Sequence, residues 1–212
     1  MTHQAEQNTR LGIWLMIAAV AAFAAQDGFS RYLASEYNTL MVVMVRYWVF
    51  AGFVILLALR QPAGPRTAIK SGHMRVHVAR SLLLVGEICV IVWGYTLIGL
   101  IESHAVFAIC PLLIAAFSGL ILGERIVWQR WLAIGAGMVG VIVILRPGLG
   151  VFTPAALLPL AAAVMFALYS ILTRLTTRDE PTFPSFFWPG VIGAVVMTGL
   201  GLPNWQAVAP AD

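Results

Sequence analysis

Three ionisable side chains interrupt long apolar stretches of the sequence, and they are its strongest candidates for chemistry. Asp27, Arg46 and Glu87 each lie inside a run of residues that is otherwise apolar. A charge in the hydrocarbon of a membrane is costly, so such residues face a bundle interior or a water-filled cavity, where they contact substrates, ions or one another. These three positions therefore mark the centre of a candidate site.

Asp27 and Arg46 are predicted to lie at the same depth. At a rise of about 1.5 Å per residue, each lies about 9 Å from the outer end of its helix, so the sequence permits an ion pair between neighbouring helices. Such a pair would be either a structural link or part of a substrate site, and the sequence leaves both open.

Glu87 is predicted near the centre of its run, about 16 Å from the outer end. An apolar environment favours the neutral form of a carboxyl group. Glu87 is therefore a candidate proton-coupling group, and the alternative is a protonated structural contact to a neighbouring helix.

Neutral polar and aromatic side chains in the apolar runs are further candidates for substrate contacts. The hydrogen-bonding candidates are Gln26, Ser30, Tyr169 and Ser170, and the aromatic candidates are Trp93 and Tyr95. Aromatic faces suit a flat or cationic solute. The alternatives are hydrogen bonds between helices for the first group and an aromatic belt at the membrane interface for the second.

Seven apolar runs must position these residues. They cover residues 11–33, 40–59, 78–98, 105–122, 131–145, 154–175 and 184–202. Each is about long enough to cross a hydrocarbon core of ~30 Å as a helix. Of 212 residues, 60% are hydrophobic and 10% are charged, whereas soluble domains carry roughly 25% charged residues. The sequence predicts an all-α, polytopic membrane helical bundle.

The fourth and fifth runs form a predicted helical hairpin with a short charged hinge. Pro111 lies inside the first arm, where it removes a backbone hydrogen bond and predicts a kink. In the hinge, Glu124 beside Arg125 predicts an ion pair at the membrane surface. The second arm carries small residues at small-xxx-small spacing, which predicts the close approach of a neighbouring helix; they include Gly135, Gly137 and Gly140.

Basic residues divide unevenly between the two predicted faces. Ten lie on the face that holds the N-terminus, namely Arg10, Arg60, Arg66, Lys70, Arg75, Arg80, Arg125, Arg130, Arg174 and Arg178, and two lie on the other, Arg31 and Arg146. The positive-inside rule then places the N-terminus in the cytoplasm, in a multi-pass protein of the cell inner membrane. The net charge of +4 therefore reflects membrane orientation, and no nucleic-acid partner is expected.

A weak internal repeat appears when the chain is compared with itself at an offset of 143 residues. Phe23, Ala24 and Arg31 match Phe166, Ala167 and Arg174. The stretch 11–25 also looks like a secretory signal, but its internal copy favours a membrane span. A repeat of five helices is odd, so the two copies must face opposite ways. The predicted units are 11–148, with helices one to five, and an incomplete second unit at 154–212.

Motifs of enzymatic chemistry are absent from the sequence. It holds no Cys/His cluster with metal-ligand spacing, no glycine-rich phosphate loop and no G-x-S-x-G. We therefore expect no cofactor, no metal site and no enzymatic activity. A membrane enzyme would need a nucleophile and a base at shared depth, and none is evident.

The hairpin also carries a family resemblance. The order of a small-rich helix with a central proline, then L-G-E-R, then Q-R-W-L, then a glycine-rich helix ending in L-R-P-G resembles EamA-type transporters of the drug/metabolite superfamily. The segments R-S-L-L-L-V-G from Arg80 and M-V-V-M-V-R-Y from Met41 add to the match. The resemblance covers about residues 11–202.

This resemblance implies ten helices, as five plus five, around a central substrate cavity. It implies a secondary transporter of small metabolites or drug-like solutes, with substrates among amino acids, nucleoside-like compounds and organic cations. The second unit here has two helices, so we expect a truncated chain, a homo-oligomer or a completing partner chain. The alternative function is a non-transporting membrane fragment that assembles with a partner.

Overall fold

The computed structural model describes residues 2–62, 64, 66, 69–123, 127–145, 153–177 and 180–205, without the side chains of 2–11, 130, 141, 144 and 145. Within these ranges the chain is helical and contains no strand. The helices are α1 (Thr2–Glu36), α2 (Thr39–Leu59), α4 (Met74–Ile98), α5 (Leu100–Phe107), α6 (Cys110–Leu122), α7 (Trp128–Leu145), α8 (Leu157–Thr177) and α9 (Thr182–Gly201). Two short 3₁₀ turns, η2 (Pro154–Ala156) and η3 (Leu202–Asn204), precede α8 and follow α9.

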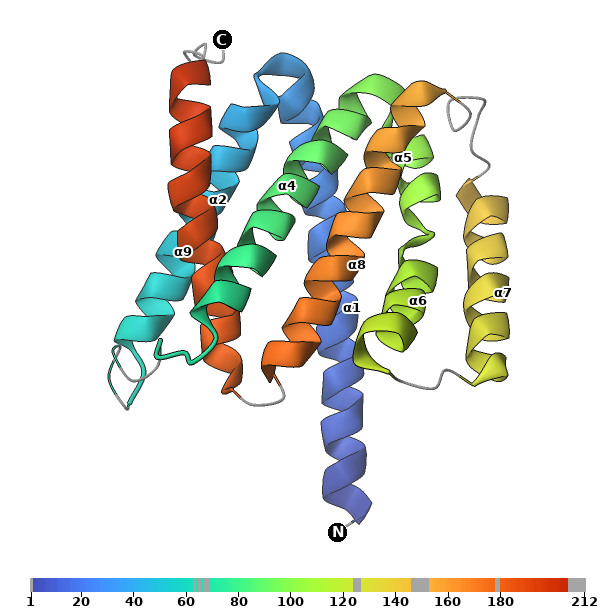
Figure 1. Ribbon diagram of the computed structural model, residues 1–212, viewed down its shortest axis with the longest axis horizontal. Helices are drawn as coiled ribbons and strands as arrows, with labels where there is room; N and C mark the ends of the chain where they lie inside the picture. Colours follow the sequence, from blue (N-terminus) through green and yellow to red (C-terminus); the bar gives the residue numbers. More distant parts are fainter. Residues whose placement is uncertain are drawn as a thin grey trace.

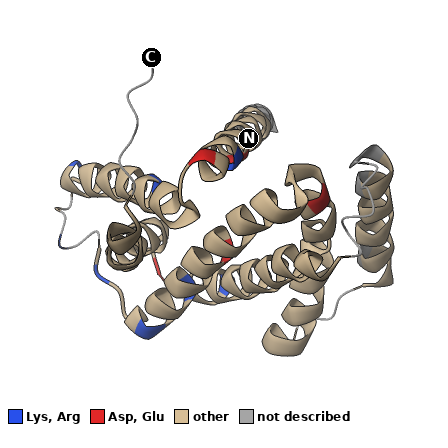
Figure 2. Ribbon diagram, turned by 90° about the horizontal axis from the view of Figure 1, so that it is seen from above, with Lys and Arg blue, Asp and Glu red and all other residues tan. Residues whose placement is uncertain are grey.

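The predicted polytopic helical bundle is confirmed. Six segments of the described chain are long and apolar enough to cross a membrane: Gly12–Glu36, Thr39–Leu59, Met74–Ile98, Leu100–Leu122, Pro154–Thr177 and Thr182–Asn204. The remaining predicted run, the fifth at 131–145, corresponds to α7, whose described apolar stretch, Trp131–Gly140, is shorter. Seen from above, charged positions are few along the helices (Figure 2).

Successive spans alternate in direction, and α5 and α6 run the same way as the two parts of one span (Figure 1). We call the end that holds the start of α1 the N-terminal face, and the end that holds the last turn of α9 the opposite face. The ends of α2, α6 and α8 and the starts of α4, α7 and α9 lie at the N-terminal face. The helices α1 and α8 run in opposite directions, as do α2 and α9.

The centre of the bundle is α4, which packs most extensively against α8 and α9. The other large contact is between α2 and α9. There the absence of a side chain at Gly193 is required, because a Cβ atom would lie 2.1 Å from the buried Tyr47 ring. The start of α2 is fixed by Asn38, whose Oδ1 accepts a hydrogen bond of 2.9 Å from the amide of Leu40.

The fourth predicted run is two helices. Gly99 ends α4 with a positive φ of 91°, a conformation that favours glycine. After about two further turns, α5 stops at Phe107 and α6 starts at Cys110, with Pro111 in its first turn. A proline in a first turn costs no helical hydrogen bond, because that amide has no partner inside the helix.

The small residues of α7 do not meet a neighbouring helix in this structure. A Cβ atom added at Gly135, Gly137 or Gly140 would find no heavy atom within 4 Å. The close approach expected from their spacing is therefore wrong for the described chain. The helix contacts α5 and α6 only lightly.

Candidate functional site

A polar group from three helices lies inside the half of the bundle toward the opposite face. His104 of α5 places Nε2 3.6 Å from Asp27 Oδ2 of α1 and 3.4 Å from the hydroxyl of Tyr95 of α4. The Tyr95 and His104 rings also pack together, with centroids 5.4 Å apart. The Asp27 and His104 side chains remain 23% and 38% exposed. We call Asp27, Tyr95 and His104 the central polar group.

Arg46 and Glu87 flank this group without joining it directly. Arg46 of α2 acts electrostatically on both Asp27 and Glu87. Glu87 is buried, at 6% exposure, in the middle of α4. Among the described residues, however, the ion pair of Asp27 is with His104 and not with Arg46. The expected Asp27–Arg46 pair is therefore corrected, because the first turns of α5 bring an imidazole closer to the carboxylate.

Two buried hydroxyl groups near the same region have no hydrogen-bond partner. They are Tyr47 Oη on α2 and Ser103 Oγ on α5, next to His104 in the chain. Buried polar atoms are nearly always satisfied, so unpaired ones indicate places where water or a ligand can bind. Ser30, one turn beyond Asp27 on α1, is also buried, at 6% exposure. No pattern in the sequence selected Tyr47 or Ser103 as a site residue.

The other predicted contact residues lie apart from the central polar group. Trp93 is 54% exposed on the surface of α4. Ser170 donates a hydrogen bond of 2.8 Å to the carbonyl of Phe166 within its own helix. Gln26 is half-buried on α1, and Glu124 lies outside the described residues.

Tyr169 belongs to a second buried site, around Arg80 of α4. The guanidinium carbon of Arg80 lies 5.5 Å from the centroid of the Tyr169 ring. Arg80 is fully buried and donates to Thr176 Oγ1 at 2.9 Å. It also donates to Ser185 Oγ at 3.3 Å and to the Ser185 carbonyl. One side chain of α4 thus binds both α8 and α9.

The bond from Arg80 to the Ser185 carbonyl has a cause in the sequence of α9. In a regular helix this carbonyl would accept from the amide four residues later. That residue is Pro189, which lies inside α9 and has no amide hydrogen. Arg80 therefore supplies the donor that the proline removes. From the sequence, Arg80 was counted among the basic residues of the N-terminal face and in a motif of the family resemblance, and neither indicates this role.

Metal binding finds no support in the described part of the chain. No group of three or more His, Cys, Asp or Glu side chains there is arranged to hold an ion. A shallow apolar hollow of about 390 Å³ is lined by Ala25, Gly28, Phe29 and Tyr32 of α1. These residues lie on a different face of α1 from Asp27 and Ser30, at about 100° per residue. The polar chemistry is therefore concentrated in the bundle interior.

A family model that describes the EamA-like transporter family matches residues 10–146. The chain belongs to the EamA-like transporter family. The match covers α1 from residue 10 onward and α2 to α7, and it includes all three residues of the central polar group. The resemblance seen in the hairpin motifs is confirmed.

Several EamA-like relatives are named for the metabolites they carry. The chain is 27% identical over 192 residues to a protein named S-adenosylmethionine uptake transporter from Rickettsia prowazekii, covering 91% of this chain and 64% of the relative. It is 27% identical over 198 residues to a riboflavin transporter from Vibrio cholerae, covering 92% and 65%. A riboflavin transporter from Brucella anthropi is 28% identical over 196 residues, covering 91% and 66%. No solved structure matches the chain.

The chain thus spans just under two thirds of the length of these relatives. Its described residues form a multi-pass membrane bundle of a family of transporters.

Proposed function

We propose that this chain carries the substrate site of a secondary transporter for a small metabolite. The observation that supports the proposal best is the central polar group, in which Asp27, Tyr95 and His104 meet from three helices of an otherwise apolar bundle. Polar residues at such a depth are costly and are kept for substrates, ions or one another. The names of the relatives supply the class of solute.

The chemistry of the central polar group fits a flat solute that carries polar or cationic groups. Asp27 offers a carboxylate, and the neighbouring rings of Tyr95 and His104, tilted by 34° to each other, offer faces on which a heteroaromatic ring can pack. Arg46 adds a positive charge within electrostatic range. S-adenosylmethionine and riboflavin, the solutes named for the relatives, are therefore the first probes to use.

Three other features support proposals about the coupling ion and the topology of the transporter. We propose that Glu87, buried at the centre of α4, carries the coupling proton. The antiparallel pairs α1/α8 and α2/α9 support two inverted units, at 11–148 and 154–212. The uneven basic residues support an N-terminus in the cytoplasm of a cell with this protein in its inner membrane. A cysteine at Lys70 that labels from outside intact cells would overturn the orientation.

Transport by the chain is tested in proteoliposomes that contain the purified protein. We expect uptake of radiolabelled S-adenosylmethionine or riboflavin, and at least a ~10-fold loss for Asp27→Asn or His104→Gln, because each removes one side of a charge-assisted contact. The matched control is Glu102→Gln, because Glu102 also carries a carboxyl group, in the first turn of α5, but is not part of the central polar group. Equal uptake by all variants would refute the site.

The rival function is a non-transporting membrane subunit that assembles with a second copy or a completing chain. The weak packing of α7 favours this possibility for the described chain. Absence of uptake by the purified chain, together with uptake after addition of a partner, would establish the rival. Uptake by the chain alone would dismiss it.

A further inference from the structure

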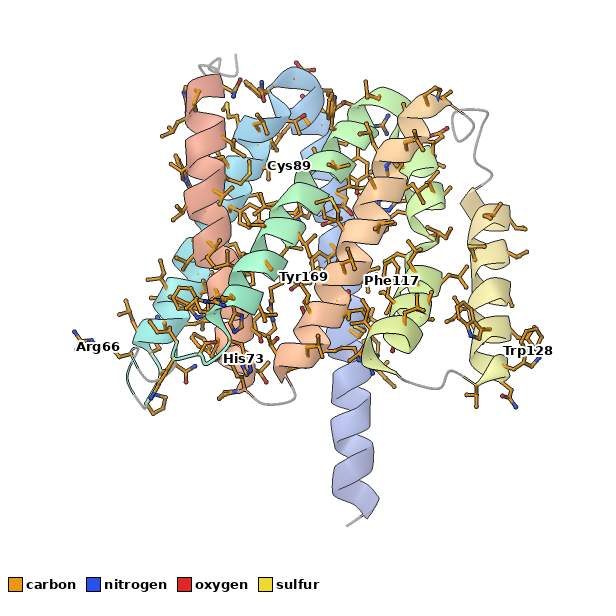
Figure 3. The ribbon with its side chains drawn as sticks, in the orientation of Figure 1. Arg66, His73, Cys89, Phe117, Trp128 and Tyr169 are labelled. Atoms are coloured by element: carbon orange, nitrogen blue, oxygen red, sulfur yellow. The ribbon has the colours of Figure 1, made fainter. Side chains whose placement is uncertain are left out.

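His73 lies at the N-terminal face (Figure 3), where one carboxylate binds residues at the start of α4. Glu180, in the α8–α9 connection, accepts from Ser71 Oγ at 2.8 Å and from the Gly72 amide at 2.7 Å. It accepts from the His73 amide at 3.0 Å and lies 3.1 Å from His73 Nδ1. His77 Nε2 lies 2.9 Å from its second oxygen. We call Ser71, Gly72, His73, His77 and Glu180 the clasp.

The clasp compensates for a missing helix cap. The first amides of a helix have no partner within the helix, and the helix dipole favours an anion there. The residue before α4, His73, makes no side-chain cap of its own. Glu180 supplies the cap from a distant part of the chain. Although burial alone would raise the pKa of Glu180, bonds from His77, Ser71, His73 and the Gly72 amide outweigh it and lower the pKa to about 2.

The clasp and Arg80 join the same helices but differ in their access to water. Arg80 lies fully buried two turns into α4, where its bonds to α8 and α9 have no substitute. The clasp lies at the surface, and its His73 side chain is 48% exposed. When the ends of α4, α8 and α9 at the N-terminal face separate, water can therefore replace the hydrogen bonds of the clasp, but not those of Arg80.

At the N-terminal face, the contact between α4 and the α8–α9 connection is closely packed. Toward the opposite face, the Asp27 and His104 side chains keep part of their surface exposed. Toward the N-terminal face, Glu180 is 7% exposed and His77 fully buried, and beneath them Ser81 is also fully buried. The only charged contacts that cross from α4 to the α8–α9 connection, among the described residues, are those of the clasp.

We propose that the clasp is the gate of the N-terminal face, which must open for solute to pass between the central polar group and that side. The gate rests on the proposed transport function, but its opening is measured without any substrate. The helix α4 belongs to the unit that the family model matches, and Glu180 lies beyond it, so the gate joins the two proposed units. Opening exchanges the hydrogen bonds of the clasp for bonds to water.

The test uses two buried serines as reporters in a chain whose two cysteines are replaced by alanine. Ser81→Cys lies one turn below His77, and Ser103→Cys lies near the opposite face; both positions are fully buried. A membrane-impermeant maleimide is added from the N-terminal face of reconstituted protein. Glu180→Gln keeps the shape of the side chain and removes its charge, and Glu102→Gln at the other end is the control.

We expect Glu180→Gln to raise the labelling rate of the Ser81 reporter about tenfold or more, because it weakens several charge-assisted hydrogen bonds at once. Ser71→Ala, a milder change, should raise it less. The Ser103 reporter and the Glu102→Gln control should stay at the original rate. An unchanged Ser81 rate would overturn the gate, and an equal rise at both reporters would show general loosening and also overturn it.

Failure of the gate and failure of the transport proposal are distinguishable. If Glu180→Gln raises the labelling rate of the Ser81 reporter but the unaltered chain takes up neither S-adenosylmethionine nor riboflavin, only the proposed substrates are refuted. Uptake by the unaltered chain without a clasp response refutes only the gate.

Discussion

Replacing Arg80 by methionine should destabilise the bundle by about 2 kcal/mol, as a balance of opposing effects. The substitution loses charge-assisted bonds, which contribute about 1.5–3 kcal/mol each, and strands the Ser185 carbonyl at a further cost of about 1–3 kcal/mol. It also removes a buried guanidinium, whose desolvation costs several kcal/mol. Thr176 is not stranded, since its hydroxyl also lies within bonding distance of the Leu172 and Thr173 carbonyls. The cost of leaving the Ser185 carbonyl without a donor therefore makes the substitution destabilising overall.

A second substitution isolates that carbonyl. Pro189→Ala restores an amide four residues after Ser185, and this amide can bind the Ser185 carbonyl. Pro189→Ala should therefore be more favourable to stability in the Arg80→Met background than in the unaltered chain, by about 1 kcal/mol. Gly199→Ala, elsewhere in α9 where an added Cβ meets nothing within 4 Å, is the control and should show no coupling. The free energy of unfolding is measured for all combinations by denaturant titration in detergent. A coupling energy indistinguishable from that of the control would refute the role assigned to Arg80.

Three further outcomes are expected. Gly193→Ala should cost about 1–3 kcal/mol in the same unfolding assay, because its Cβ would overlap a buried tyrosine ring; an unchanged midpoint would contradict the packing of α2 on α9. Glu87→Gln should abolish solute accumulation driven by a proton gradient while leaving exchange intact in the same proteoliposomes, and normal accumulation would make Glu87 a structural contact. The folded pKa of Glu180 is lowered from 4.5 to about 2, so its contribution to stability is present above about pH 4.5 and is lost as the pH falls toward 2. The melting temperatures of the unaltered chain and Glu180→Gln should therefore converge in that window, and a difference that persists at pH 2 would contradict it.

Hydropathy was sufficient to predict the helices, because each span must satisfy its backbone within itself and so leaves a long apolar run in the sequence. The break between α5 and α6 was anticipated only as a kink at Pro111. It lies instead before the proline, whose missing amide is harmless in the first turn of α6. The direction of each helix followed from simple alternation, and Figure 1 agrees with it.

Partners within the bundle were harder to predict, because they depend on helix rotation and on contacts distant in sequence. Their equal predicted depth in the membrane suggested that Asp27 pairs with Arg46. Depth alone, however, cannot show that the His104 side chain points toward Asp27. The sequence does indicate a polar face on the N-terminal half of α4, because His73, His77 and Arg80 recur at helical spacing and so share one face. Their acceptors lie about a hundred residues away, as in the contact of His77 with Glu180 across 103 positions, and no local pattern identifies them.

The distance between Glu180 and the start of α4 also has a consequence for how the protein is made. Glu180 follows His73 by 107 residues. At about 5–20 residues per second, a ribosome needs on the order of ten seconds to add that length. Throughout this interval the nascent α4 has neither its cap nor the acceptors of Arg80, all of which come from α8, α9 and their connection. The newly made α4 must therefore keep Arg80 near the aqueous edge of the bilayer, or within the insertion machinery, until the last described helices are synthesised.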